Sequence, residues 1–464
     1  MAEPKFRIES DLLGELKVPI DAYYGVQTQR ALNNYRISNT RMCDYPEYVI
    51  AIAYVKMAAA EANAELGVLT EEKKQLIVRV CDEIISGKLD DQFPLVVWQT
   101  GSGTQTNMNV NEVVAHRAEE LRNGSLHADT YISPNDDVNR SQSTNDVFPT
   151  AMRMALATRL LDETIPALSL LRRRLEERAE AFRKIIKIGR THMQDATPLR
   201  LGSEFSAYAT QVGYGIRALE NALPHLMELP VGGTAVGTGL NTPSGYDRLC
   251  VRYICQFTKK PFVPAPDKFE AMSSHDAMVE VSSALKQLAV SLMKISNDIR
   301  LSASGPRSGI GELNLPQNEP GSSIMPGKVN PTQCEAMCMV CAQVIGFDAA
   351  VSVAGMQGHW QLNVFMPMIA YDMLTSARLL GDACVSFANH CVAGITANEE
   401  RIRTHLNQSL MLVTALNPHI GYHRAAKIAQ YAYAYGTSLK EAAVATGLVS
   451  AQDFDQWVDP EKMV

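Results

Sequence analysis

Long stretches of the chain repeat apolar residues every three or four positions, which is the period of an amphipathic α-helix. The clearest stretch runs from Met278 to Ile299, where apolar residues are spaced 3-4-3-4-3-4. Such a seam, sustained over about three heptads, predicts a long helix that packs nearly parallel to its neighbours. Similar patterns predict further long helices over 149–183, 200–228, 331–356 and 363–392.

Proline and glycine divide this pattern. Pro166 lies inside 149–183 and should kink or divide that helix, because proline lacks an N–H group and clashes with the preceding turn. Strand-like alternation is sparse, and the last part of the chain is a shorter helical tail with breaks at 418–421 and near Gly436. The pattern predicts a mainly α protein with three domains: a mixed, mostly helical one (1–140), a central long-helix bundle (141–392) and a small helical one (393–464).

The composition is that of a globular protein. The chain has 464 residues, of which 46% are hydrophobic and 20% charged, so it can build a sizeable core. A count of 43 basic against 50 acidic residues gives a net charge of −7, which argues against nucleic acid or an anionic membrane as a partner. Charged or strongly polar residues interrupt every stretch of about 20 residues, so we expect no membrane span.

The cysteines and the N-terminus bear on the compartment. Nine scattered cysteines indicate reduced thiols in a cytosolic protein rather than a disulfide framework. Cys338 and Cys341 have C-x-x-C spacing, but they lie in a helical run without a second pair, which favours core packing over a metal site. The acidic N-terminus has no apolar core, so we expect neither a signal nor a transit peptide. We expect a cytoplasmic protein, or a mitochondrial matrix protein if the chain is a processed form.

Four polar, glycine-rich stretches interrupt the helical pattern, at 98–109, 135–146, 189–198 and 305–335. Serine, threonine and asparagine dominate them, and Arg190 and Lys328 add positive charge. Hydroxyl, amide and backbone N–H donors at helix N-termini suit a small carboxylate or phosphate. One such loop would be an ordinary helix cap, but four of them, each beside a long helix, favour an anion site.

The segment from Gly321 to Pro331 reads Gly-Ser-Ser-Ile-Met-Pro-Gly-Lys-Val-Asn-Pro and resembles the signature of the fumarase/aspartase superfamily. Segments that begin at Trp98, Pro134, Asn145, Ile188 and Lys328 resemble the class II fumarases more closely. The likeness runs over effectively the whole chain. It implies a mainly α, three-domain fumarase/aspartase-like fold, whose long-helix bundle forms the core of a homotetramer with active sites shared between subunits.

The resemblance also implies a reaction and the residues that perform it. Class II fumarases add water in anti fashion to fumarate, giving (S)-malate through an aci-carboxylate intermediate, without a cofactor or metal. By the family's pattern, Ser322 on a mobile loop is the base, Lys328 stabilises its alkoxide, and His192 paired with Glu335 is the acid/base. The dicarboxylate ligands carried over are Ser102, Gly103, Thr104, Ser143, Thr144, Asn145, Thr191, Ser323, Lys328 and Asn330.

Two alternatives remain on this fold. Aspartate ammonia-lyase is one, because the segment from Ala22 and the residue Thr144 resemble aspartases, although the loops at Gln99 and Asp195 resemble fumarases. A non-catalytic structural protein is the other. The four intact candidate catalytic residues argue against it: Ser322, His192, Lys328 and Glu335.

A second anion site of the family departs from its pattern here. Fumarases often begin this site with a histidine, whereas this chain reads Ser133, Pro134, Asn135 and Asp136. Loss of the imidazole removes one anion ligand from this accessory site, so we expect at most weak anion binding there, by the backbone and Asn135.

Overall fold

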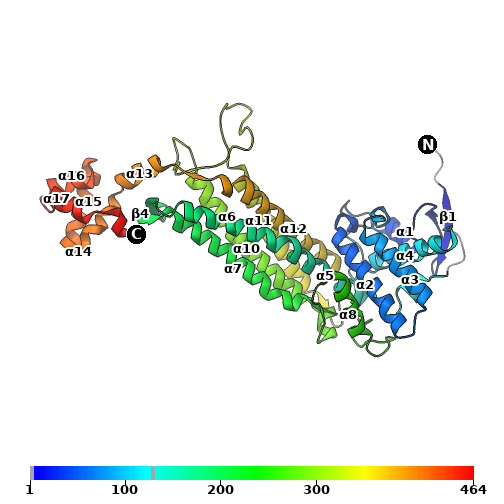
Figure 1. Ribbon diagram of the computed structural model, residues 1–464. Helices are drawn as coiled ribbons and strands as arrows, with labels where there is room; N and C mark the ends of the chain where they lie inside the picture. Colours follow the sequence, from blue (N-terminus) through cyan, green and yellow to red (C-terminus); the bar gives the residue numbers. More distant parts are fainter. Residues whose placement is uncertain (1–4, 127–130) are drawn as a thin grey trace. The chain divides into compact units, whose positions relative to one another are not determined.

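The computed structural model describes residues 5–126 and 131–464. Helices account for most of the described residues, and the short strands among them pair into two-stranded ribbons (Figure 1). This agrees with the mainly α prediction. The described chain divides into two compact units, each assembled from separate segments. Unit 1 comprises 1–166, 217–289 and 342–381, and unit 2 comprises 167–216, 290–341 and 382–464. The three-domain division along the sequence stays a prediction.

Unit 1 is built around a buried, alanine-rich helix, α2 (Pro46–Glu65). Its small side chains let three helices pack closely around it, and Ile52, Ala53, Val55 and Ala58 have no exposed surface. The helices that lie wholly in this unit are α1 (Val26–Asn34), α2, α3 (Glu71–Ile85), α4 (Thr104–Asn123), α5 (Thr144–Arg159), α8 (Tyr246–Thr258) and α9 (Lys268–Ser273). Its ribbons pair β1 (Phe6–Asp11) with β2 (Gly14–Pro19), β5 (Glu228–Leu229) with β6 (Val263–Pro264), and β8 (Gly358–His359) with β9 (Leu362–Asn363).

The predicted division of the helix over 149–183 is confirmed. A π-helical turn, Leu160–Thr164, separates α5 from α6 (Ile165–Ala181). There the Ile165 N–H bonds to the Leu160 carbonyl, one residue further back than in an α-helix. The break falls directly before Pro166, which cannot donate the next helical hydrogen bond.

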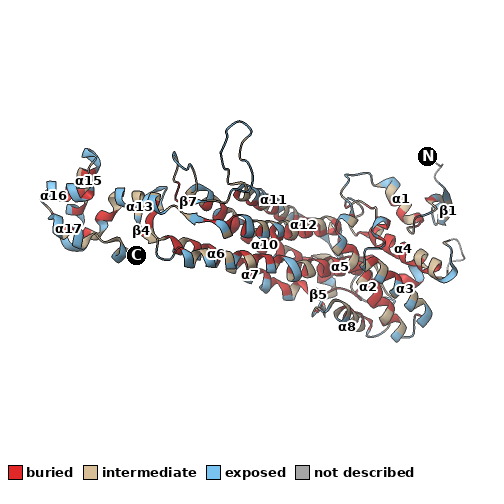
Figure 2. Cartoon of the chain, turned by 45° about the horizontal axis from the view of Figure 1, so that its top comes forward, coloured by how far each residue is buried: buried red, intermediate tan, exposed pale blue. Residues whose placement is uncertain are grey.

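Four further long helices contribute residues to both units: α7 (Leu201–Leu226), α10 (Asp276–Ser302), α11 (Thr332–Gly355) and α12 (Met366–His390). Their bounds match the predicted helices to within a few residues. The heptad seam of α10 is buried in the described structure, as Figure 2 shows for this helix, and its members are Met278, Val281, Leu285, Leu288, Leu292, Ile295 and Ile299.

Among the described helices, α11 alone is long and apolar enough to bear on the expectation of no membrane span, which stays a prediction. By length and composition this helix could cross a membrane, since its most apolar window has a mean hydropathy of 1.8. Glu335 and Asp348 are its only two acidic residues, and it carries no basic residue, so the polar breaks seen in the sequence are weaker than expected. Core helices of soluble proteins meet the same criterion.

Unit 2 holds a hairpin, a short ribbon and the C-terminal helices. The hairpin pairs β3 (Ile186–Thr191) with β4 (Gln194–Arg200), and the ribbon pairs β7 (Leu313–Asn314) with β10 (Thr396–Ala397). Leu416, Ile428 and Ala442 are fully buried in the C-terminal core. The helices there are α13 (Glu399–Gln408), α14 (Asn417–Ile420), α15 (Tyr422–Tyr435), α16 (Leu439–Ala445) and α17 (Ala451–Trp457). The predicted breaks are confirmed, because Gly421 and Gly436 have φ of 82° and 64°.

The cysteines agree with the sequence prediction. All nine are free, and six of them are buried. Cys341 packs in the core from α11, while Cys338 lies half-buried on the same helix. No group of three potential metal ligands occurs among the described residues.

Candidate active site

The first polar loop ends at Gly103, which caps the start of α4. Its φ is +75°, and a Cβ there would lie 2.0 Å from the Phe148 ring, so only glycine fits. Ser102 and Thr104 flank this glycine, and their hydroxyl oxygens lie 2.9 Å apart. The close packing therefore places two hydroxyls beside the first N–H groups of α4, where the helix dipole favours an anion.

The second polar loop starts α5 through a capping box. The Ser143 Oγ accepts the Asn145 N–H at 3.2 Å, and the Asp146 carboxylate accepts the Ser143 N–H at 2.9 Å. The other Asp146 oxygen accepts the Gly232 N–H at 2.8 Å. Burial raises the pKa of Asp146, although these N–H donors oppose the change. Asp146 thus fixes the loop that presents the Ser143, Thr144 and Asn145 side chains.

A buried polar network joins these two loops. The Asn107 side chain of α4 donates to the Thr144 hydroxyl at 2.9 Å and to the side-chain oxygen (Oδ1) of Asn139 at 3.2 Å. The Lys56 ammonium from α2 donates to Asn139 and to Gln142, both at 2.9 Å. Lys56 has no exposed surface, and burial lowers its pKa to about 7. The structure therefore brings the first and second predicted loops together within unit 1.

The third loop is the turn of the β3–β4 hairpin. Thr191 pairs with Gln194, so His192 and Met193 form a two-residue turn, with φ of 56° and 61°. Type I′ turns need positive φ at both positions and usually contain asparagine and glycine. The side chains of Thr191 and His192 are exposed at the tip. The hairpin therefore presents the candidate acid/base on a strained turn.

The fourth loop surrounds Ser322 with backbone donors. The Ser322 Oγ accepts the Ile324 N–H at 3.2 Å and the Met325 N–H at 3.0 Å. The loop closes on itself, because the Gly321 N–H donates to the Lys328 carbonyl at 3.0 Å and the Asn330 amide donates to the Gly321 carbonyl. A Cβ on Gly321 would lie 2.2 Å from the Lys328 oxygen. The signature glycine thus permits the closed loop, while the predicted mobility of the loop stays a prediction.

The predicted site residues fall into two groups. Unit 1 holds Ser102, Gly103, Thr104, Ser143, Thr144 and Asn145, and unit 2 holds Thr191, His192, Ser322, Ser323, Lys328, Asn330 and Glu335. In the described chain, His192 and Glu335 form no ion pair with each other, and both are exposed. His192 lies on the hairpin turn and Glu335 on the first turn of α11. Their expected pairing is therefore absent within one chain.

The segment predicted as a possible second anion site, from Ser133 to Asp136, forms a helix cap with its own side chains. The Ser133 Oγ accepts the Asp136 N–H at 3.0 Å and donates to the Asp136 carboxylate at 3.3 Å. The Ser133 N–H donates to Asp137, which pairs with Lys73 at 2.6 Å. Serine here completes a helix cap closed by two carboxylates, so an anion would have to displace them. Asn135 is exposed beside this cap.

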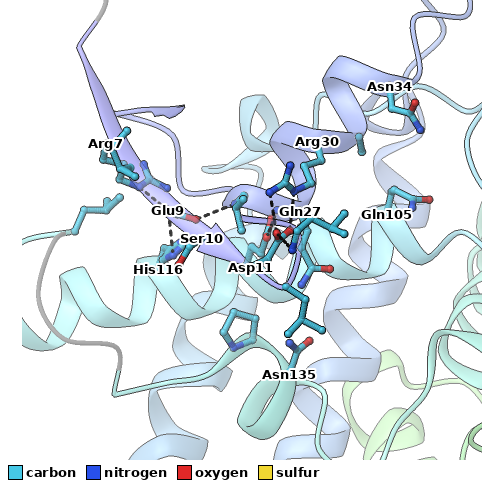
Figure 3. A pocket seen from close by; sticks show the side chains of 18 of the residues that line it. Arg7, Glu9, Ser10, Asp11, Gln27, Arg30, Asn34, Gln105, His116 and Asn135 are labelled. Carbon is cyan, nitrogen blue, oxygen red and sulfur yellow. Dashed lines mark hydrogen bonds and ion pairs between the residues drawn. The ribbon is translucent and has the colours of Figure 1, made fainter. Parts of the chain in front are cut away.

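A pocket of about 1190 Å³ lies beside Asn135 in unit 1 (Figure 3). Its two arginines are already paired: Arg30 makes two 2.8 Å hydrogen bonds to Asp11, and Arg7 makes one of 2.7 Å to Glu9. The pocket therefore offers no unpaired arginine for an anion, and the carboxylates of Glu112 and Glu119 also line it.

Comparisons with known proteins agree with this arrangement of helices and donor-rich loops. The family model described as "Lyase" matches residues 14–346, and the one described as "Fumarase C C-terminus" matches 412–464. A class II fumarate hydratase from Pasteurella multocida is 60% identical over 460 residues, covering 99% of both chains. The mitochondrial fumarate hydratase of Homo sapiens is 55% identical over 463 residues, covering 100% of this chain and 91% of that protein.

A solved structure shows the same fold. The class II fumarase from Schistosoma mansoni superimposes with a TM-score of 0.96 at 43% identity, and 99% of each chain is covered. The fold and the loops thus define a lyase of the fumarase/aspartase superfamily. Within that superfamily, the chain belongs to the class II fumarate hydratases.

The sequence analysis did not identify the buried charged residues that hydrogen-bond to the candidate loops. Lys56 lies in the apolar helix α2. Glu312, which accepts hydrogen bonds from Arg190, directly precedes β7. Neither residue belongs to a recognisable motif. Asp146 alone carried a signal, because it lies three residues after Ser143, where a capping box places an acidic residue.

Proposed function

We propose that the protein catalyses the reversible hydration of fumarate to (S)-malate. The hard step removes a proton beside a carboxylate and builds an additional negative charge on a dianion. Hydrogen-bond donors oriented toward the developing charge stabilise the transition state, so catalysis needs such donors more than it needs a strong base. The loops at Gly103 and Ser143 supply such donors for the substrate carboxylates.

The observation that carries this proposal is the donor pair at Ser322. A serine hydroxyl is a weak base unless its alkoxide is stabilised, and hydrogen bonds to the charged form do this. The N–H groups of Ile324 and Met325 already point at the Ser322 Oγ, at 3.2 Å and 3.0 Å. Lys328 follows on the same loop and adds a positive charge. In dehydration Ser322 takes the proton from C3, and His192 gives a proton to the departing hydroxyl of C2.

We propose further that the protein is a homotetramer whose sites are shared between subunits. Within one chain His192 does not pair with Glu335, so the pairing requires a Glu335 from another copy. Helix α11 supports association, because Met339 and Val353 are 68% and 51% exposed on an apolar helix. By likeness to the bacterial relatives we propose a cytoplasmic location.

The direct test measures fumarate by its ultraviolet absorbance after the purified protein is mixed with L-malate and, separately, with L-aspartate. Fumarate from malate alone supports the proposal. Fumarate from aspartate alone would make the protein an aspartate ammonia-lyase, and no turnover of either substrate would favour a structural protein.

A further inference from the structure

The carboxylate of Glu312 is completely buried in unit 2 and is surrounded by basic side chains. Arg190 donates to it through both terminal nitrogens, at 2.6 Å and 3.1 Å. The Lys187 Nζ lies 3.2 Å away and the His405 Nδ1 lies 3.0 Å away. A buried carboxylate is costly unless it is paired in this way. Nothing in the proposed mechanism uses this cluster.

The hairpin is bent to bring two of these cations to one carboxylate. Lys187 and Arg190 are three residues apart on β3, so a regular strand would direct them to opposite faces. Between the pairs Ile188–Pro198 and Arg190–Asp195, β4 has one residue more than β3. Such a bulge increases the local twist, and here both cations reach Glu312.

Glycine permits this bulge. A Cβ on Gly189 would lie 2.6 Å from the Thr197 carbonyl oxygen on the bulged strand, so a side chain there would push the strands apart. Arg190, the next residue, is thereby fixed to Glu312 only two positions before His192. The Arg190–Glu312 contact, called the clamp below, therefore lies at the end of β3, next to the strained turn of His192 and Met193.

The charges around Glu312 are nearly balanced. Lys187 also pairs with Glu204 of α7 at 2.9 Å, and Asp195 lies opposite Arg190 on β4. Burial works against the charge of Glu312, but the hydrogen bond from Arg190, the charge of Lys187 and the hydrogen bond from His405 lower its pKa to about 2. Glu312 is therefore an anion throughout the range in which an imidazole titrates.

We propose that Glu312 is a positioning residue for the hydration reaction: through Arg190 it holds the strained His192 turn, and its charge balances the cations beside His192. This inference rests on the proposed function. Glu312 acts through Arg190 on the β3–β4 hairpin and not by contact with the substrate. The strain of a turn persists only where the surrounding structure holds it, and the Arg190–Glu312 clamp is the adjacent holding contact.

The test is the variant Glu312→Gln, studied as the full-length protein. Glutamine keeps the shape but removes the negative charge that Arg190 and Lys187 share. We expect kcat for fumarate hydration to fall at least tenfold while KM rises less than threefold. Loss of the negative charge of Glu312 disfavours the imidazolium, so the acid limb of the kcat/KM profile should move down by about half a pH unit.

Two further variants separate positioning from general stability. Glu204→Gln removes the other carboxylate partner of Lys187 but keeps the hydrogen bonds between Arg190 and Glu312. We therefore expect kcat to stay within twofold and the acid limb to move less than in Glu312→Gln. Arg190→Lys keeps the positive charge but loses the bidentate hydrogen bond to Glu312. We therefore expect kcat to fall while the acid limb of the kcat/KM profile stays in place. Arg190→Lys also decides the matter if Glu312→Gln does not fold.

The outcomes are distinct. A folded Glu312→Gln protein that melts at a lower temperature, yet keeps the wild-type kcat and acid limb, would show a purely structural role and overturn the inference. Wild-type activity in Arg190→Lys would overturn it as well. A wild-type protein without fumarate hydration would instead refute the proposed function, so the two failures are told apart by the wild-type assay.

Discussion

The Asn107 side chain donates to the Thr144 hydroxyl at 2.9 Å and thereby ties α4 to the start of α5. This bond fixes the spacing between the two loops that are proposed to bind the substrate carboxylates. Each loop is held by contacts of its own, namely the packing of Gly103 against Phe148 and the Ser143 cap. Their relative position depends on contacts of this kind between the two helices.

Asn107→Ala tests that relation. The variant loses the hydrogen bonds to Thr144 and Asn139, at a cost of about 1–3 kcal/mol, and we expect KM for fumarate to rise about tenfold. Asn109→Ala is the matched control, because this buried amide on the same helix bonds to Gln92 instead, at 2.9 Å. Equal KM changes in both variants, measured by steady-state kinetics, would count against a role of Asn107 in the site.

The backbone donors at Ser322 can be removed one at a time. Ile324→Pro deletes the N–H that points at the Ser322 Oγ, whereas Ile324→Ala keeps it and changes only a side chain that is 83% exposed. We expect kcat to fall at least tenfold in the proline variant and to stay within twofold in the alanine variant. Ser322→Ala should lose at least a hundredfold. Similar rates in the proline and alanine variants would show that the Ile324 N–H does not support the base.

Lys56 predicts how stability changes with pH. Burial lowers its pKa to about 7, so between this value and its unfolded pKa, near 10.4, the unfolded chain binds more protons. Stability should therefore rise with pH across this window, by a few kcal/mol at most. Lys56→Met should lack this rise. Melting temperatures of both proteins from pH 7 to pH 10 check the prediction, and parallel curves would contradict it.

Shared active sites predict complementation between inactive variants. Ser322→Ala and His192→Asn should each be nearly inactive as homotetramers. If one site takes Ser322 and His192 from different subunits, hybrid tetramers regain some intact sites. We expect activity to return when the two proteins are unfolded, mixed and refolded together, but not when each is refolded alone. No gain in the mixture would place both residues in one chain.

Much of the fold follows from local pattern. The apolar seam of α10, the break before Pro166 and the glycines at 421 and 436 each act within a few residues, so the sequence is enough to predict them. The expectation of no membrane span stays a prediction for α11, whose two acidic residues interrupt a long apolar pattern.

The site was predictable only where a motif marks it. The loop around Ser322 and the hairpin at His192 are contiguous in sequence, and the resemblance identifies both. Lys56 and Glu312 act across more than 80 and 120 residues, on Asn139 and Arg190 respectively. Such pairings depend on tertiary packing, and no local pattern encodes them. The proposed pairing of His192 with Glu335 joins two chains, and a local sequence pattern does not encode such a contact.

Because each unit is assembled from segments that are far apart in the sequence, the order of synthesis affects when each unit can fold. Unit 1 includes residues 342–381, and unit 2 includes the C-terminal segment from residue 382 onward. During synthesis, residues 1–166 must wait for a segment that is translated far later before their unit is complete. Neither unit can close as an early, independent domain on the ribosome. A chain that stops before residue 342 would leave both units unfinished, so fragments of this protein should be poor folders even where their helices are intact.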